Sequence, residues 1–199
     1  MTAQPAVGRG AVAVGPSVDR ARRRSRLVLG GAAAIVLVAD VATKQLALSG
    51  LEGREPVRLL GGAVYLTLTR NSGAAFSFGA DHTWVFPLVT IAVVGWIMWM
   101  ARRLRSIPWA LALGLVLGGG LGNLTDRLFR APGPFLGHVV DMVSLFDPYG
   151  RVWPVFNLAD SALVTGVTLA VALELTGRQR DGSRLPTRGT DDESGRERQ

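Results

Sequence analysis

Cysteine is absent from the 199 residues of this chain, and histidine occurs only twice, at His82 and His138. Without cysteine, the chain has no disulfide, no thiolate nucleophile and no iron–sulfur cluster. It also lacks the G-x-S-x-G, H-E-x-x-H and G-x-x-x-x-G-K-[ST] motifs of serine hydrolases, zinc peptidases and phosphate-binding loops. We therefore expect no metal and no cofactor. A zinc site built from His138 and Asp141 is the alternative, although its ligand set is thin.

Charged residues are also scarce, at 19% of the chain, whereas hydrophobic residues make up 48%. The hydrophobic residues gather in four windows. Each window is long enough to cross about 30 Å of hydrocarbon at about 1.5 Å per helical residue. We expect an all-α membrane protein with a bundle of four transmembrane helices. The predicted spans are residues 27–49, 84–101, 107–124 and 155–176.

The net charge of +7 comes largely from arginines that lie next to these spans. One cluster precedes the first span, another separates the second from the third, and another follows the fourth. Because basic loops stay on the cytoplasmic side, both termini are expected in the cytoplasm, with residues 50–83 and 125–154 facing outward. The clusters are Arg20, Arg22, Arg23, Arg24 and Arg26; Arg102, Arg103 and Arg105; and Arg178 and Arg180.

Residues 1–26 then form a basic cytoplasmic arm, residues 27–176 the membrane domain, and residues 177–199 a charged cytoplasmic tail. The arm and the tail are both expected to be disordered. A cleaved secretory signal peptide is an alternative for the N-terminal region, because arginines precede an apolar run there. That apolar run is longer than the hydrophobic core of a usual signal peptide, which argues against this alternative. Nucleic-acid binding would need the arginines on one folded face between stacking aromatics, so no nucleic-acid partner is expected.

The two outward loops are expected to form a small β-sheet on the extracytoplasmic side. Val64, Leu66 and Leu68 alternate with polar residues, which is the period-two pattern of a half-buried strand. In the second loop, the stretch GHVVDMVSL lies between glycine and proline residues that favour turns, and it is a candidate pairing strand. Asp141 sits in the middle of that stretch. Taken alone, it is expected on a solvated strand face.

Polar residues inside the predicted spans share one depth, the outer third of the membrane. Asp40 and Lys44 lie on one helical face, and Lys44 can extend toward the interface. Asp160 is expected about five residues into the fourth span, roughly 8 Å deep at about 1.5 Å per residue. A charge at a helix centre costs roughly 2.5 to 3.5 kcal/mol, and less near the interface or when paired. The remaining members of this group are Asn123, Asp126, Arg127 and Asn157.

Some of these residues also have a purely structural interpretation. Asp40 with Lys44, and Asp126 with Arg127 or a neighbouring helix, are candidate ion pairs that hold the bundle together. That interpretation is weaker for Asp160, because its own helix supplies no cation. The third span also carries Gly114, Gly118 and Gly122 at spacings of four, a pattern that favours close helix packing.

Asp141 and Asp160 can do chemistry together if the outer loop meets the start of the fourth span. When two carboxyl groups share a site of low dielectric, repulsion and desolvation raise one pKa, so the pair retains one proton. The ionised carboxylate can deprotonate a water while the protonated one donates to a carbonyl oxygen. This is aspartic peptide hydrolysis.

Five short strings, taken in order, closely resemble the bacterial lipoprotein signal peptidases, also called type II signal peptidases. Any one of these strings alone is a weak signal. Their order and spacing fit the family across roughly residues 35–165, with slight departures at Met142 and Thr125. The strings are DVATK with Asp40 and Lys44, RNSGAAFS with Asn71, GNLTDR with Asn123, Asp126 and Arg127, HVVDM with Asp141, and VFNLAD with Asn157 and Asp160.

The resemblance implies a membrane endopeptidase that removes signal peptides from prolipoproteins before a diacylglyceryl-modified cysteine. It places the catalytic pair at Asp141 and Asp160. It implies four membrane helices with a small outer sheet, a site near the extracytoplasmic face, membrane lipid as surroundings, and a monomer. Site-shaping or supporting roles go to Asn71, Asn123, Arg127 and Asn157, and to Asp40, Lys44 and Asp126.

Two other classes remain as alternatives. A small transporter or proton relay also keeps carboxylates inside the membrane. Transporters tend to place their sites at the midplane between internal repeats, and no repeat is visible in this sequence. A noncatalytic membrane scaffold is the other alternative, favoured if asparagine at both positions leaves lipoproteins mature.

Overall fold

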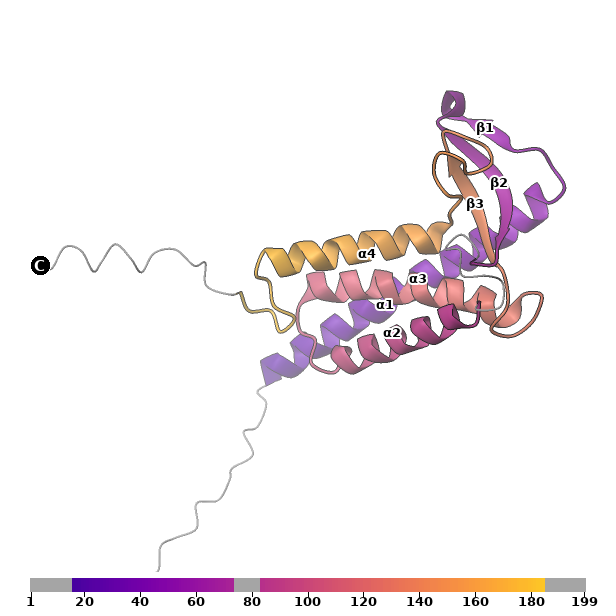
Figure 1. The fold of residues 1–199 in the computed structure, drawn as a ribbon. Coiled ribbons are helices and arrows are strands. Elements are labelled where there is room, and N and C mark those ends of the chain that lie inside the picture. The colour runs from indigo at the N-terminus through magenta and orange to yellow at the C-terminus, as the bar shows by residue number, and fades with distance from the viewer. Residues whose placement is uncertain (1–15, 74–82, 185–199) are drawn as a thin grey trace, which may run out of the picture.

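The structure is a computed structural model that describes residues 16–73 and 83–184. Four α-helices form a bundle, and a small sheet stands at one end of it (Figure 1). A short 3-10 helix, η1 (Leu60–Gly62), joins the first two strands. The helices are α1 (Pro16–Leu51), α2 (Val85–Ala101), α3 (Ile107–Phe129) and α4 (Leu158–Leu175), and the strands are β1 (Val57–Leu59), β2 (Val64–Asn71) and β3 (Val139–Leu145).

The helices have the character of a membrane protein. Within the described ranges, α1, α3 and α4 are long and apolar enough to cross a membrane, and α2 is a shorter apolar helix of 17 residues. Large apolar side chains such as Ile35, Val38 and Val164 are exposed on the outward faces of the helices. Such faces suit a lipid solvent, in which backbone polar groups must be satisfied inside each helix.

The first helix begins earlier than predicted. It starts at Pro16 instead of residue 27, so Arg20 to Arg26 are helical and the predicted disorder is wrong for residues 16–26. The Arg26 guanidinium donates to the carbonyls of Ala101 at 3.3 Å and Arg102 at 2.9 Å. These contacts tie the start of α1 to the last turn of α2. The rest of the predicted arm, residues 1–15, lies outside the described residues.

The start of the predicted C-terminal tail is also folded. Residues 177–184 form a turn closed by a β-bridge between Arg178 and Arg184. Backbone N–H groups of Arg105 and Ser106 donate to the Arg180 carbonyl at 3.0 and 3.1 Å, and Trp109 Nε1 donates to the Arg178 carbonyl at 2.7 Å. The predicted disorder is therefore wrong for 177–184, while 185–199 lie outside the described residues.

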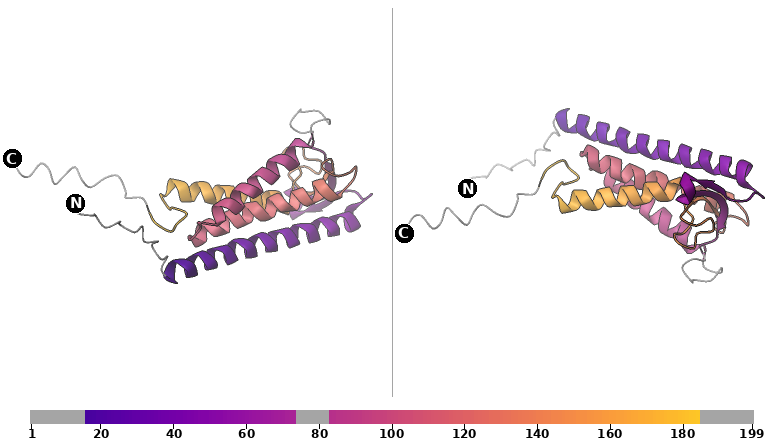
Figure 2. Two further views of the ribbon diagram at one scale, coloured as in Figure 1. Left: turned by 90° about the horizontal axis from the view of Figure 1, so that it is seen from below. Right: turned by 90° about the horizontal axis from the view of Figure 1, so that it is seen from above.

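Helix α3 lies at the centre and packs against the other three helices (Figure 2). A Cβ added at Gly118 would stand 2.7 Å from the Ala33 carbonyl of α1, and one at Gly119 would stand 2.5 Å from the Ala159 carbonyl of α4. The predicted close packing is confirmed: Gly114, Gly118 and Gly122 face α1. A second small-residue contact, which includes Gly166 of α4, was not predicted.

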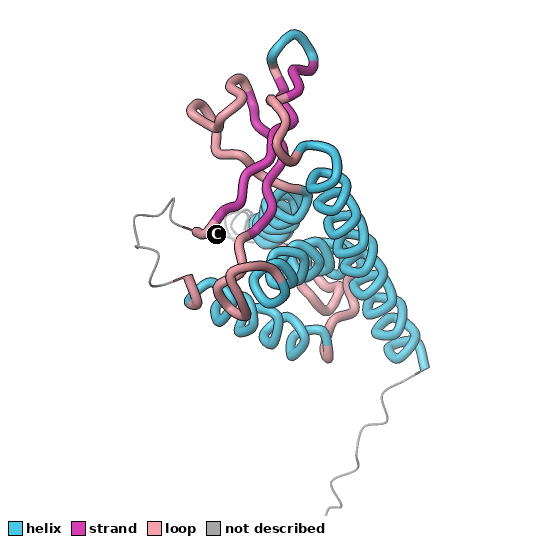
Figure 3. The backbone as a smooth tube through the Cα atoms, turned by 90° about the vertical axis from the view of Figure 1, so that its right-hand side faces the viewer, coloured by secondary structure: helices cyan, strands magenta, loops and turns pink. Residues whose placement is uncertain are grey.

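The sheet is antiparallel with the order β1-β2-β3, and it rises over one end of the helices (Figure 3). Both predicted strands form and pair with each other, whereas β1 was not predicted. Leu66 pairs with Val143 and Thr69 with Asp141, with a register shift between these two pairs. Ala47 of α1 packs with Val140 and Met142 beneath the sheet. This contact fixes the sheet to the bundle.

Candidate active site

Asp160 lies in the first turn of α4, nearer the helix end than predicted. The predicted span began at residue 155, but Phe156 forms a β-bridge with Val143 and the helix begins at Leu158. Asn157 is the N-cap: its side chain accepts from Asp160 N at 3.0 Å, and Asp160 Oδ2 accepts from Asn157 N at 3.1 Å. This capping box fixes the orientation of the Asp160 carboxylate at the helix N-terminus, where negative charge is favoured.

Asp141 is buried, with 1% of its surface exposed, so a solvated strand face is the wrong interpretation. Its two carboxylate oxygens accept hydrogen bonds from different elements. Asn71 Nδ2, at the end of β2, donates to Asp141 Oδ2 at 3.0 Å, and Asn157 Nδ2 donates to Asp141 Oδ1 at 2.6 Å. The side chain and the backbone of Asn157 therefore bind Asp141 and Asp160, respectively.

Asn123 of α3 completes the link between the two carboxylates. Its Nδ2 donates to Asp160 Oδ1 at 2.8 Å, while its Oδ1 accepts from Asn157 Nδ2 at 3.1 Å and from Lys44 Nζ at 3.0 Å. Because both ends of the Asn123 amide are occupied, its orientation is determined by its partners. The strand, α3 and α4 thus converge on one hydrogen-bonded network.

A buried ion cluster supports that network from behind. Lys44 Nζ lies 2.7 Å from Asp40 Oδ2 and 3.0 Å from Asp126 Oδ2, and Lys44 is fully buried instead of extending to the interface as predicted. Asp40 also accepts from the Ala159 N–H at 2.9 Å, and Asp126 from the Val140 N–H at 3.1 Å. Asp40 and Asp126 therefore hold the backbone next to Asp160 and Asp141, respectively. The predicted Asp40–Lys44 ion pair is confirmed.

Arg127 does not pair with Asp126 in the described structure. Its Nη1 donates to the Gly137 carbonyl at 3.0 Å, and its guanidinium lies over the Phe86 ring, 5.6 Å from the centroid. Asp126 instead pairs with Lys44 and with Arg130. We did not predict Arg130 or Phe86, although the four-residue spacing from Asp126 to Arg130 is a usable signal for a helical ion pair.

The two carboxylates open into a cavity of about 330 Å³ between α2, α3 and α4. Its polar end carries Asn71, Asn123, Arg127, Asp141 and Asp160. Aliphatic and aromatic side chains line the remainder, as in most sites for extended apolar ligands. These apolar residues include Phe86, Val89, Val93, Ile97, Val116 and Leu163.

The surroundings of Asp141 favour its protonated form. The pKa of this carboxyl is raised to about 6: burial is the largest cause and the charge of Asp160 also raises it, while hydrogen bonds from Asn71 and Asn157 lower it. A proton is therefore retained on this carboxyl well above the usual range for aspartate. Asp160 accepts hydrogen bonds from the Asn123 side chain and from the Asn157 backbone. Two carboxyl groups that line one cavity of low dielectric can share one proton.

The zinc alternative finds no support in the geometry. His138 lines a different hollow, between α1, β2 and the end of α3, while Asp141 faces the cavity. Across residues 16–73 and 83–184, no group of three or more His, Asp or Glu side chains is placed to hold a metal ion.

The sequence and the fold both resemble those of known proteins. A family described as signal peptidase (SPase) II matches residues 32–176. The lipoprotein signal peptidase of Mycobacterium avium (strain 104) is 50% identical over 163 residues, which cover 82% of this chain and 86% of the relative. The lipoprotein signal peptidase of Rhodococcus jostii (strain RHA1) is 52% identical over 159 residues, covering 80% and 78%. A solved bacterial membrane enzyme has a TM-score of 0.64 at 26% identity, covering 77% of this chain and 93% of that one.

Proposed function

The chain belongs to the signal peptidase II family, and from this we propose that it removes signal peptides from prolipoproteins by aspartic hydrolysis, with Asp141 and Asp160 as the catalytic pair. The observation that carries the proposal is their arrangement. Asn157 donates to Asp141 Oδ1 at 2.6 Å and to Asp160 Oδ2 at 3.1 Å. Both carboxylates line the same cavity.

In the proposed reaction, Asp160 is ionised and takes a proton from a water molecule. The water oxygen attacks the carbon of the scissile carbonyl, while protonated Asp141 donates its proton to the carbonyl oxygen. The tetrahedral intermediate then collapses: the amine nitrogen takes the proton from Asp160, the C–N bond breaks, and one hydroxyl returns its proton to Asp141 as the new carbonyl forms. Assigning the resting proton to Asp141 follows from its raised pKa of about 6.

The neighbouring residues have supporting roles in this proposal. Asn71, Asn123 and Asn157 orient the carboxylates through the hydrogen bonds described above. Arg127 shapes the polar end of the cavity beside Phe86. The cluster of Asp40, Lys44 and Asp126 keeps β3 and the first turn of α4 in register.

The membrane arrangement is part of the same proposal. All four helices span the membrane, both termini are cytoplasmic, and the sheet and the carboxylates lie near the extracytoplasmic face. A diacylglyceryl-modified cysteine keeps its acyl chains in the bilayer, so the bond before that cysteine lies near the membrane surface. The apolar walls of α2 and α3 would contact the signal peptide, and the chain would act as a monomer surrounded by lipid.

The test is cleavage of a diacylglyceryl-modified prolipoprotein by the purified full-length protein in detergent, beside the same prolipoprotein without the lipid. Mass spectrometry of the products identifies the bond that is cut. Cleavage of the lipidated form alone, immediately before the modified cysteine, is the expected result. Equal cleavage of both forms would contradict the proposed specificity, and a lack of cleavage of either would contradict the enzymatic function.

A further inference from the structure

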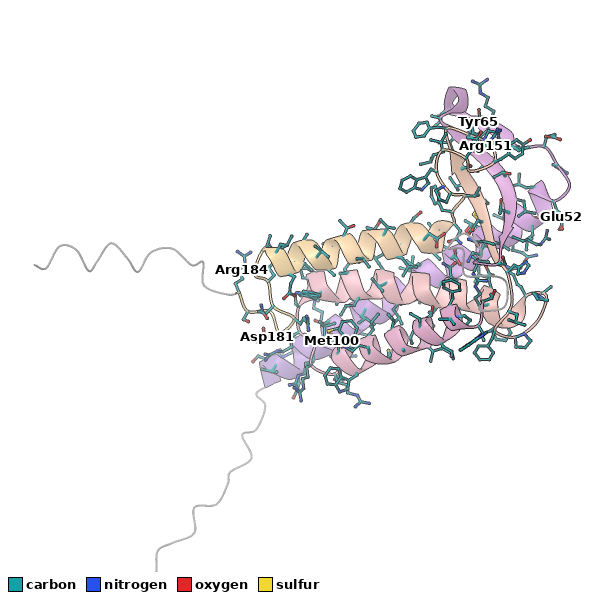
Figure 4. The ribbon with its side chains drawn as sticks, in the orientation of Figure 1. Glu52, Tyr65, Met100, Arg151, Asp181 and Arg184 are labelled. Atoms are coloured by element: carbon teal, nitrogen blue, oxygen red, sulfur yellow. The ribbon has the colours of Figure 1, made fainter. Side chains whose placement is uncertain are left out.

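Another hollow lies at the end of the bundle opposite the sheet. It has a volume of about 330 Å³ and is formed where the C-terminal turn, residues 177–184, meets the end of α2. Met100, Asp181 and Arg184 mark this end in Figure 4, far from Glu52 and Tyr65 at the sheet end. The principal lining residues are Trp99, Arg103, Gln179, Arg180, Asp181 and Ser183.

This end of the molecule is strongly basic. The segments 16–26, 102–105 and 174–184 contain eleven arginines and three acidic residues, a net formal charge of +8, whereas the whole chain carries +7. In the ribbon these segments meet at one end of the bundle (Figure 1). Such a concentration of one sign attracts anions, and the attraction is strongest next to a surface of opposite charge.

Two acidic side chains lie near the hollow, and each pairs with one arginine. Asp181 lies 3.1 Å from Arg105, and Glu174 lies 3.6 Å from Arg180. Arg180 is also held over the Trp109 ring, 5.1 Å from its centroid. Within the described part of the chain, the Arg103 side chain makes no hydrogen bond or ion pair. The Arg103 guanidinium is therefore available to a ligand, and Arg180 lines the same hollow.

The rim of the hollow is apolar and aromatic. Trp99 lines the hollow and is 60% exposed; Trp96, about one turn earlier in α2 and outside the lining, is 52% exposed. Tryptophan is enriched where a membrane protein meets the headgroup layer. A ligand that satisfies both the guanidinium groups and the indole rings has an anionic head and an apolar body.

We propose that this hollow binds the phosphodiester headgroup of an anionic membrane phospholipid, with Arg103 and Arg180 contacting the phosphate and Trp99 contacting the glycerol and the first methylenes. The folded turn 177–184 creates the site, because it carries Arg180 to α2. The inference rests on the membrane arrangement proposed above, which puts this end at the cytoplasmic leaflet. It does not depend on the catalytic assignment.

The experiment is a lipid titration of the delipidated full-length protein in detergent, with bound lipid counted by native mass spectrometry. Phosphatidylglycerol is the probe, and zwitterionic phosphatidylcholine with the same chains is the comparison. Removing one guanidinium should weaken phosphatidylglycerol binding about fivefold, which corresponds to about 1 kcal/mol. The double variant Arg103→Gln/Arg180→Gln should then bind about 25-fold more weakly.

Arg54→Gln is the matched control, because Arg54 is exposed near the sheet end and has no interaction with the hollow. It should leave lipid binding unchanged. Equal binding of phosphatidylglycerol to the double variant and the wild type, or equal binding of the two lipids to the wild type, would overturn the proposal. Circular dichroism and the unfolding temperature establish that each variant is folded.

Two further arms separate this site from a simple anion site and from the active site. Glycerophosphoglycerol and inorganic phosphate should compete only weakly, since they lack acyl chains. Competition as strong as that of the lipid would overturn the assignment to a lipid. The double variant should still cleave lipidated prolipoprotein, so failure of lipid binding and failure of the proposed function give different results.

Discussion

Asn157 and Asp160 cap the first turn of α4 reciprocally, each side chain accepting a hydrogen bond from the other residue's backbone N–H. The proposed catalytic carboxylate is therefore also a structural cap. An asparagine at position 160 retains an oxygen that can accept the same bond. Substitution there can remove the charge without removing the cap, which makes the chemical role separable from the fold.

We expect Asp160→Asn and Asp141→Asn to insert into the membrane and fold but to leave prolipoprotein uncut. Removing a group that transfers protons in the transition state costs about 10² to 10⁴ in rate, and each variant should lose at least that much. The loss is measured by incubating equal amounts of purified protein with lipidated substrate. Glu55→Gln is the matched control, because it removes an exposed carboxylate outside the cavity. Full processing by either aspartate variant would refute the assignment.

The pKa of Asp141, about 6, gives a prediction for the pH dependence of cleavage. This carboxyl keeps its proton below about pH 6 and loses it above, so kcat/KM should fall on the alkaline side with a midpoint near 6. The Asn71 hydrogen bond stabilises the ionised form and lowers the pKa. Asn71→Ala should therefore move the midpoint to higher pH.

The control for the pH profile is Thr69→Ala. Thr69 pairs with Asp141 across the sheet but is exposed. Its removal should leave the midpoint in place. A midpoint that does not move in Asn71→Ala would show that Asp141 is not the group being titrated.

Lys44→Met should strongly destabilise the protein. The substitution leaves Asp40 and Asp126 buried without their shared cation, and breaking a buried pair in this way costs about 3 to 5 kcal/mol. The measurement is the thermal unfolding midpoint in detergent. The comparison is Arg70→Met, because the ion pair between Arg70 and Glu52 is about half exposed on both sides (49% and 57%) and such pairs contribute at most about 1 kcal/mol. Similar effects of the two substitutions would contradict the proposed importance of the buried cluster.

Gly122→Ala should reduce both stability and cleavage. A Cβ at this position would stand 2.5 Å from Asp40 Oδ2 and 3.3 Å from the Ala159 Cβ, so α3 must move away from α1 and α4. Overpacking of this kind costs about 1 to 3 kcal/mol. Gly95→Ala is the control, because no atom lies within 4 Å of its added Cβ and alanine favours the helix. An equal response of the two variants would show that close packing at Gly122 is not required.

Sequence patterns predicted the parts of the site that depend on local spacing. The Asp40–Lys44 pair follows from a four-residue helical repeat, and the strand that carries Asp141 follows from its position between turn residues. The burial of Asp141 does not follow from its apolar neighbours. It results from Asn71 and Asn157, which are distant in the sequence and reach the carboxylate only in the folded chain.

The errors have a common physical cause. Composition predicted disorder for residues 177–184, but the turn is held by backbone acceptors of Arg178 and Arg180 and by the Trp109 ring. Lys44 was expected to extend toward the interface while staying near Asp40, yet Asp40 of α1 and Asp126 of α3 together hold it in the interior. Contacts between distant segments decide both outcomes, and a single sequence does not display them.

Phe156 and Val143 exchange two backbone hydrogen bonds of 2.9 Å, and the very next residue, Asn157, starts the cap of α4. The Phe156–Val143 pair is therefore a backbone link between the sheet and the start of α4, with Asp141 two residues before Val143 and Asp160 four residues after Phe156. Loss of these two hydrogen bonds would separate Asp141 from Asp160 while every helix stays intact. On gentle heating, proteolytic activity should therefore be lost before the helical signal in circular dichroism begins to fall. The activity should return on cooling.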